Sequence, residues 1–436
     1  MRRYWTISLS IGGGAAAVAL ALLWTGAFEA ASEWLWRLWV ARGWAEEGGA
    51  MWLRPVEILT VCLAGFGVAW GIVEATRIWQ KAFVAALAMA AAALLAPALA
   101  LYGLRFDPFA TLAAAALAAA GGFFFARTEE GRRKRLLEDA LGLRVSASVF
   151  AELLEAPPRD PGMTGTAREV TTLVCRLFPP EGAKASESPV DLMKVGSLFA
   201  RSVSAFLVAR GAYVEEVGPE RVRASFGMLR DEEDHAERAC RAALDLRGRL
   251  KGLAKECESR WFLPLRGGIG IGSGTMAVGL CGTPGRHFLA GLGGEADFAD
   301  RLALANARFG SDVLIGPGVY RLVRERFEVR PLEMLYDPMA QALAEIYELL
   351  APAESFAEGE KSRRDCFWRG VVHLRAGDCE AALEQFSRAR VPGGEDAPLA
   401  YLTGCAQEGL GRPESRPSRL LREFTEEGHA RLAQRL

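Results

Sequence analysis

The sequence predicts a membrane protein with an α+β domain: four transmembrane helices, then a soluble α+β part, then a helical hairpin. Three observations predict this organisation. Up to about residue 126 the chain consists mainly of Ala, Leu, Gly and Trp, with few charges. Between about residues 168 and 352, short apolar runs alternate with helical patterns. After residue 358, small and aromatic residues recur at the spacing of paired helices.

Four long apolar stretches precede residue 127, and a bilayer core takes about 20 apolar residues to span. They cover residues 7–28, 58–73, 82–104 and 109–126. The second is shorter and is flanked by Glu57 and Glu74. Buried helices of a globular protein are the alternative interpretation. We assign residues 1–126 to a membrane domain with four transmembrane helices in the lipid bilayer.

Basic residues predict the orientation of these helices. Arg2 and Arg3 precede the first stretch, Arg77 and Lys81 lie between the second and third, and a basic segment follows the fourth. With an even number of spans, this bias places both termini and the soluble domain in the cytoplasm, at the inner (plasma) membrane. The WLWRLW segment at 34–39 is expected at the outer interface. Cleavage of the first stretch as a signal peptide remains open.

Composition excludes some classes of function. The net charge of −1 gives no indication of nucleic-acid binding, and none is expected. The Cys residues form no Cys-x-x-Cys pair and are expected to be reduced core thiols. The four His residues are widely spaced, so a His-based metal site is not expected.

The remaining chain divides into three parts. Residues 127–160 are predicted to be cytoplasmic linker helices with basic residues near the lipid headgroups. Residues 165–352 form the α+β domain. Its helices are predicted at 191–209, 233–257 and 295–308, and its strands at 169–177, 213–217, 221–226, 266–272, 275–280, 312–315, 327–332 and 344–350. Residues 358–436 form a tetratricopeptide-like tail, expected to dock on the preceding domain or on a partner protein.

Two glycine clusters, at 272–277 and 291–296, match the G-x-G-x-x-A pattern of dinucleotide-binding loops. The first precedes a strand, and the second lacks a clean βαβ unit with an acidic residue at a strand end. Dinucleotide binding is therefore not predicted. Ser273 lies in a sequence close to a nucleophile elbow and is interpreted as part of a turn.

Several segments of the α+β domain resemble class III nucleotide cyclases. AREVTTLVCRLF (167–178) is similar to their opening strand, and DHAERACRAALDL (234–246) to their second helix. LRGGIGIGSGTMAVGLCG (265–282) resembles their central hairpin, and GGEADFADRLALANARF (293–309) their third helix. The resemblance implies a ferredoxin-like fold for residues 165–352. The preceding membrane segments and the lead-in helix at 146–156 resemble those of bacterial membrane cyclases.

The resemblance also implies a site between two domains. In the family, two Asp residues hold two divalent cations, a Lys and an Asp read the purine, and an Asn and an Arg stabilise the transition state. Transferred to this chain, these positions are Arg176 and Glu220 for the metals, Glu216 and Phe288 for the purine, and Asp297 and Arg301 for the transition state. Arg301 alone matches the family in kind.

These departures weaken the case for catalysis. A guanidinium offers Mg²⁺ no oxygen ligand and repels it. We therefore expect no cofactor, with Mg²⁺ or Mn²⁺ needed only if the chain is an active cyclase. We hypothesise that Arg176 pairs with Glu220 across adjacent strands and closes the site; exposure of Arg176 to solvent is the alternative. Arg301 could instead form a helix ion pair with Asp297.

Three functions remain open. The first is a membrane-anchored pseudocyclase, acting as a dimeric regulator or scaffold in cyclic-nucleotide signalling. The second is an active adenylate or guanylate cyclase, working through an unusual site or as half of a heterodimer to which it lends Arg301. The third is a non-catalytic interaction protein whose tail at 358–436 captures a partner. The first two functions require a homodimer or heterodimer through residues 165–352.

Overall fold

The computed structural model describes most of the chain. The described residues are 2–44, 51–52, 54–75, 77–102, 104–142, 144–155, 165–178, 189–261, 265–283, 286–337, 342–391 and 393–411. The chain divides into an N-terminal unit, Met1–Gly142 with Phe150–Pro157, and a C-terminal unit, Leu143–Val149 with Pro158–Leu436. The end of the predicted tail, including Pro413 and Pro417, lies outside the described residues.

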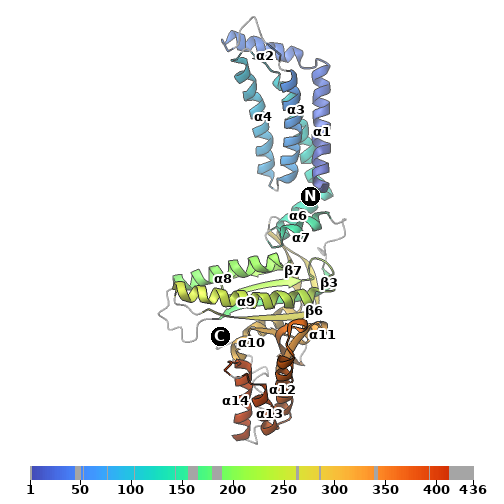
Figure 1. The fold of residues 1–436 in the computed structure, drawn as a ribbon. Coiled ribbons are helices and arrows are strands. Elements are labelled where there is room, and N and C mark those ends of the chain that lie inside the picture. Colours follow the sequence, from blue (N-terminus) through green and yellow to red (C-terminus); the bar gives the residue numbers. More distant parts are fainter. Residues whose placement is uncertain are drawn as a thin grey trace. The chain divides into compact units, whose positions relative to one another are not determined.

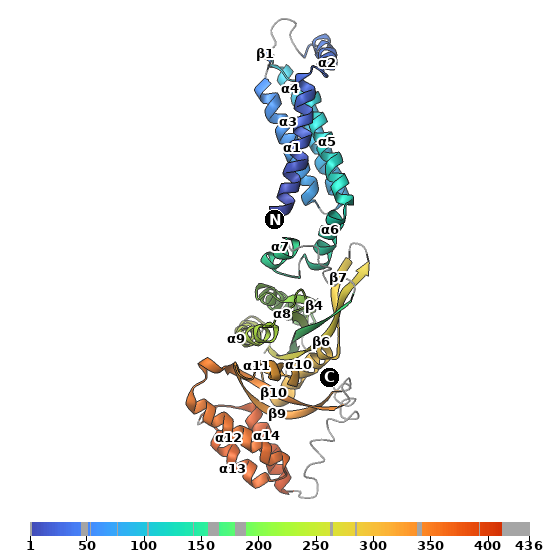
Figure 2. The same ribbon diagram turned by 90° about the vertical axis from the view of Figure 1, so that its right-hand side faces the viewer.

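The N-terminal unit is built on four long apolar helices that lie side by side (Figures 1 and 2). They are α1 (Arg2–Trp24), α3 (Arg54–Glu74), α4 (Ile78–Ala100) and α5 (Pro108–Arg127). The unit also contains α2 (Glu29–Ala41), α6 (Glu129–Leu141), most of α7 (Ala147–Glu155), and the short strands β1 (Met51–Trp52) and β2 (Leu104–Arg105). The helix α2 contains the Trp-rich segment predicted at an interface.

Small residues allow the long helices to pack closely. A Cβ atom on Gly12 of α1 would lie 2.8 Å from the Cα atom of Phe66 and 2.9 Å from the carbonyl oxygen of Gly65 on α3. Buried alanines fill the other contacts between these helices. Close approach through small side chains is the usual way in which membrane helices associate, because lipid chains are as apolar as leucine.

Within the described residues, five helices are long and apolar enough to cross a membrane. Four of them are α1, α3, α4 and α5, and the fifth is Val190–Ala209, within α8 (Pro189–Ala209) of the C-terminal unit. The helix α8 packs Phe199, Val203 and Leu207 into the core of that unit. Hydropathy alone therefore does not distinguish a membrane-spanning helix from a helix that buries one face against a sheet.

The C-terminal unit contains an eight-stranded mixed sheet in the order β4-β5-β3-β6-β8-β10-β9, with β7 paired to β6. The strands are β3 (Thr166–Phe178), β4 (Tyr213–Val217), β5 (Arg221–Phe226), β6 (Arg266–Thr283), β7 (Arg286–Leu292), β8 (Val313–Ile315), β9 (Phe327–Asp337) and β10 (Ala342–Pro352). The helices are α8, α9 (His235–Trp261), α10 (Gly294–Phe309) and α11 (Pro317–Val323). A mixed α+β sheet is thus confirmed.

Two local predictions were wrong. The strands predicted at 266–272 and 275–280 are one continuous strand, β6, and the hairpin is formed by β6 with β7. Ser273 consequently lies within a strand and not in a turn. The strand β7 and the helix α11 were not predicted. A Gly-rich sequence normally breaks a strand, but here pairing with β3 and β7 on two sides holds β6 extended.

The glycines of β6 serve a close contact with α10. A Cβ atom on Gly270 would lie 2.1 Å from the carbonyl oxygen of Ala299, and one on Gly272 would lie 2.4 Å from that of Glu295. Alternate residues of a strand share one face, so this face of β6 presents bare backbone to α10. The helix α10 is thereby held against the sheet, next to β3.

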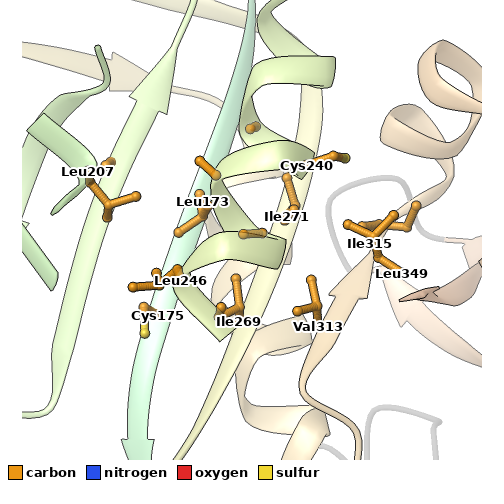
Figure 3. Close-up of a cluster of buried hydrophobic side chains, with 14 of the residues drawn as sticks. Leu173, Cys175, Leu207, Cys240, Leu246, Ile269, Ile271, Val313, Ile315 and Leu349 are labelled. Atoms are coloured by element: carbon orange, nitrogen blue, oxygen red, sulfur yellow. The ribbon is translucent and has the colours of Figure 1, made fainter. Parts of the chain in front are cut away.

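The opposite face of the sheet carries the main core. Leu173 and Cys175 of β3, Ile269 and Ile271 of β6, and Val313 and Ile315 of β8 pack under α9, as Figure 3 shows. Cys240 and Leu246 are the facing side chains of α9. The thiols of Cys175 and Cys240 are fully buried, which raises their pKa, so they are inert core groups. Cys281, by contrast, is exposed.

Three helices follow the sheet: α12 (Glu358–Arg375), α13 (Cys379–Ala389) and α14 (Ala397–Gly411). Phe367, Phe386 and Leu402 of these helices form one apolar cluster with residues of α10, β9 and β10. Arg330 of β9 lies 2.6 and 2.8 Å from the two carboxylate oxygens of Asp396, just before α14. Of the two docking modes left open for the tail, the described part adopts packing on the preceding domain.

Candidate functional site

The candidate site lies on the α10 side of β3. Side chains of a strand alternate between faces, and Leu173 and Cys175 point into the main core. Val174 lies on the other face, where it packs against Ala299 and Ala303 of α10. Arg176 shares the face of Val174 and therefore meets α10 near the end of the strand.

Arg176 belongs to a network of four charged side chains. Its Nε and Nη2 atoms donate to the two carboxylate oxygens of Asp300, on α10, at 2.8 and 3.3 Å. Arg221, the cross-strand neighbour of Arg176 on β5, donates to the same carboxylate at 3.4 Å. Arg221 also donates twice to Oε1 of Glu216, at 2.6 and 3.2 Å. Hydrogen bonding to Glu216 raises the pKa of Arg221.

The predicted pair between Arg176 and Glu220 was wrong. Glu220 is exposed, and its part in the site is a backbone carbonyl that accepts from the Leu177 amide at 2.8 Å. Glu220 lies in the turn before β5, where its side chain is free to point into solvent. Asp300 takes the predicted role because α10 is pressed against the sheet and brings a carboxylate directly over Arg176. The alternative, Arg176 facing solvent, is wrong as well.

A second polar group lies beside this network. Thr172 of β3 and Ser225 of β5 are fully buried and lie 3.1 Å apart through their hydroxyl oxygens. The Ser225 hydroxyl donates to Glu215 of β4, whose carboxylate lies 3.6 Å from Nε of Arg223. Burial raises the pKa of Glu215 above its ordinary value. This carboxylate is therefore engaged within the sheet.

The two purine-reading positions are also occupied by internal contacts. Glu216 is held by Arg221, as described above. Phe288 of β7 lies under the guanidinium of Arg144, 5.5 Å from the ring centroid. Arg144 belongs to the segment before α7, and its Nη1 atom donates to the carbonyl oxygen of Glu215 at 2.8 Å. The Arg144 carbonyl accepts from the Val214 amide at 2.9 Å, which fixes this segment on the edge of β4.

The residues at the two transition-state positions, Arg301 and Asp297, do not pair with each other in the described part of the chain. Arg301 donates to Asp337 at the end of β9, at 3.2 Å, and its guanidinium lies 5.4 Å from the Phe298 ring centroid. Asp297 is exposed on α10. The alternative ion pair between Arg301 and Asp297 is not among the contacts of the described residues, because the Arg301 guanidinium pairs with the Asp337 carboxylate instead. Burial raises the pKa of Glu295, which Asp337 raises further.

These residues do not fit a divalent metal. Among the described residues, no three His, Cys, Asp or Glu side chains come together in a way that could hold a metal ion. Asp300 and Glu216 are the carboxylates of this network, and both already accept hydrogen bonds from guanidinium groups. A cation entering here would have to displace two bound arginines from their carboxylates. No catalytic step through a metal is therefore assigned to this site.

Asp300, Arg221 and Arg144 were missed in the sequence. Asp300 had a detectable signal, because Ala296, Ala299 and Ala303 mark the buried face of α10 and Asp300 lies on that same face by helical spacing. A carboxylate in an apolar stripe indicates a buried cationic partner. Arg221 and Arg144 had no such signal, since their partners come from β4, β7 and α10.

Comparisons with known proteins agree with the resemblance. No family profile matches the chain. Over 189 residues, 43% of this chain, it is 24% identical to adenylate cyclase 1 of Rhizobium meliloti (strain 1021), and this match spans 28% of that protein. Whole-protein activity is thus not transferable from it.

Solved structures of cyclase domains are also similar. The adenylyl cyclase CyaB of P. aeruginosa is 18% identical, with a TM-score of 0.39, covering 43% of this chain and 96% of that one. The guanylyl cyclase Cya2 is 19% identical, with a TM-score of 0.41, covering 44% and 98%. The match to the curated adenylate cyclase confirms the resemblance of this chain to the class III cyclases.

Proposed function

We propose that the chain is a membrane-anchored homologue of class III cyclases that does not form cyclic nucleotide and acts as a dimeric regulator or scaffold in cyclic-nucleotide signalling. The observation that carries this proposal is that Arg176, at a position that a metal ligand occupies in the family, and its neighbour Arg221 both donate to Asp300. The carboxylates that could attract magnesium here, those of Asp300 and Glu216, are already paired with guanidinium groups of the same domain.

Electrostatics supports the proposal. Two unit charges about 4 Å apart interact by roughly 4 kcal/mol at an effective dielectric of about 20, and a divalent ion doubles this figure. Arg176 and Arg221 would both oppose a metal, while Asp300 and Glu216 are already paired. The purine positions support the same conclusion, because Glu216 offers an acceptor where the family has a donor and Phe288 offers no hydrogen bond.

The test is an assay of the full chain in detergent or nanodiscs with ATP or GTP and with Mg²⁺ or Mn²⁺. We expect no cyclic nucleotide above background for the wild type. A matched variant, Arg176→Asp with Asp300→Ala, removes the bidentate pair and restores an acidic group, and we expect it to bind Mn²⁺ more tightly than the wild type. Turnover by the wild type that Arg301→Ala abolishes would overturn the proposal.

One observation favours the heterodimer as a second candidate. Arg301 matches the family in kind, and its side chain remains 22% exposed beside Asp337. Its guanidinium group would serve a substrate held by a partner chain that supplies both metal carboxylates. Co-purification of the full chain with a second cyclase-like protein, and activity of that complex sensitive to Arg301→Ala, would favour this candidate over the first.

We propose that α1, α3, α4 and α5 span the membrane, that both termini are cytoplasmic, and that α8 remains with the sheet. Dimerisation would use the edge near β4 and β7, where Val217, Phe288 and Leu292 are exposed.

In this proposal the described helices of the tail shield the apolar residues of β9 and β10 from solvent. A partner bound through 358–436 would use their outer face, and deletion of the tail should expose the apolar cluster and lower solubility.

A further inference from the structure

Lys81 has an unusual position in the N-terminal unit. It lies in the first turn of α4 and is only 4% exposed. Its ammonium group forms no hydrogen bond or ion pair with any residue that the structure describes. Its Nζ atom is not among the fully enclosed polar atoms without a partner, so the ammonium group is reached from outside the protein and can pair with an anion there.

The charged neighbours of Lys81 favour the anion. Lys134 and Arg135 of α6 act on it as like charges, and Glu138 acts as the opposing charge. Glu138 already pairs with Lys134, whose ammonium group lies 3.5 Å from the Glu138 carboxylate. The same ammonium group lies 3.1 Å from the Glu74 carboxylate. Arg135 donates to the neutral carbonyl of Gly131. Three cations, Lys81, Lys134 and Arg135, thus face two carboxylates, Glu74 and Glu138.

Lys134, unlike Lys81, has protein oxygen atoms as partners for its ammonium group. It is 5% exposed, and its ammonium group donates to the Val73 carbonyl at 2.9 Å as well as to Glu74. The ring of Tyr4 lies 5.2 Å from the same ammonium group. The protein therefore satisfies one of two neighbouring buried ammonium groups and leaves the other without an oxygen.

We propose that Lys81, with Arg135 beside it, binds a phosphate group from outside the protein, and that an anionic phospholipid headgroup supplies it. This rests on the proposed membrane anchorage. Ile78 and Trp79, at the same end of α4, are 70% and 61% exposed. Exposed tryptophan is favoured at the membrane interface, which is the depth of lipid phosphates, and basic pockets on the cytoplasmic side bind such headgroups.

The test uses the full chain in nanodiscs of phosphatidylcholine alone or with phosphatidylglycerol, compared with Lys81→Met, Lys81→Arg and Arg132→Gln. Arg132 is an exposed cation on α6 and serves as the matched control. In phosphatidylcholine, Lys81→Met should be at least as heat-stable as the wild type. Phosphatidylglycerol should raise the melting temperature of the wild type, Lys81→Arg and Arg132→Gln, but not that of Lys81→Met.

Native mass spectrometry measures binding directly, and loss of one charge-assisted contact should weaken phosphatidylglycerol binding about tenfold. Protection by inorganic phosphate in phosphatidylcholine, lost in Lys81→Met, would support the site and assign it to a soluble anion. Equal stabilisation of the wild type and Lys81→Met would overturn it. Resistance of the chain to alkaline extraction from membranes tests the anchorage separately, and no readout depends on cyclase activity.

Discussion

The two faces of β3 are stabilised by different kinds of interaction. On one face, Leu173 and Cys175 pack under α9 in an apolar core that extends over β6 and β8 (Figure 3). On the other, Val174 meets small residues of α10 and Arg176 meets Asp300. The first face depends on hydrophobic burial, which many sequences can supply. The second depends on a few charged contacts, in which Asp300 is shared by two guanidinium groups.

The largest effect should come from the apolar face. Leu173 is fully buried, so Leu173→Ala should lower the free energy of unfolding of the C-terminal unit by about 3 kcal/mol, through lost burial and the cavity left behind. Leu292→Ala is the control, because Leu292 is 72% exposed and the change should stay within about 0.5 kcal/mol. Hydrogen exchange of β3 amides in the full chain measures both. Similar costs for the two variants would show that this face is not the core.

A smaller effect is expected on the charged face. Asp300→Ala leaves Arg176 and Arg221 side by side without their shared carboxylate, which should cost about 1–2 kcal/mol, since these side chains are about one quarter to one third exposed and solvent screens part of the repulsion. Adding Arg176→Ala should recover part of that loss. Asp297→Ala, at an exposed site on the same helix, is the matched control and should be nearly neutral. Chemical denaturation of each variant measures the difference, and equal losses at the two positions would refute the network.

The smallest effect is a pH dependence within the core face. His235 is buried, with its Nδ1 atom 2.7 Å from the Thr171 hydroxyl, and burial lowers its pKa. The unfolded chain then takes up a proton more readily than the folded one. Stability should therefore be unaffected above about pH 6.5, fall as the pH drops below that value, and level off below the folded pKa.

His235→Asn should remove this part of the pH dependence, while His373→Asn, on the partly exposed surface of α12, should leave it unchanged. Melting temperatures between pH 8 and pH 5 measure the slope. Glu169, Asp234 and Glu232 lie near enough to favour the charged ring, but burial outweighs them. A slope that is identical in wild type and His235→Asn would contradict the assignment.

Much of the architecture followed from periodicity. Strand patterns located β3, β4, β5, β8, β9 and β10, and helical patterns located α8, α9 and α10. The exception is β6, where glycines indicated a break and the structure has one strand. Only the contact with α10 explains those glycines, and a contact between distant segments leaves no local pattern. The hydropathy of α8 shows the same limit, since it resembles a membrane span although it packs on a sheet.

The residues at the candidate site were identified in sequence, but their partners were not. Arg176 was recognised as the wrong charge for a metal position, and this conclusion needs only the chemistry of a guanidinium. Its assigned partner, Glu220, was nearest along the hairpin, whereas Asp300 is 124 residues away in the chain. Arg301 was assigned Asp297 by helical spacing and contacts Asp337 instead.

The amino-acid sequence by itself determined the apolar helices, the alternating sheet and the cation at position 176, because hydrophobic period and side-chain charge are local properties. Tertiary structure alone decided which carboxylate neutralises that cation, how close α10 approaches β6, and that Lys81 is buried without an oxygen partner in the described chain. Ion pairs and burial depend on segments that meet only after folding, and many different pairings satisfy the same local pattern.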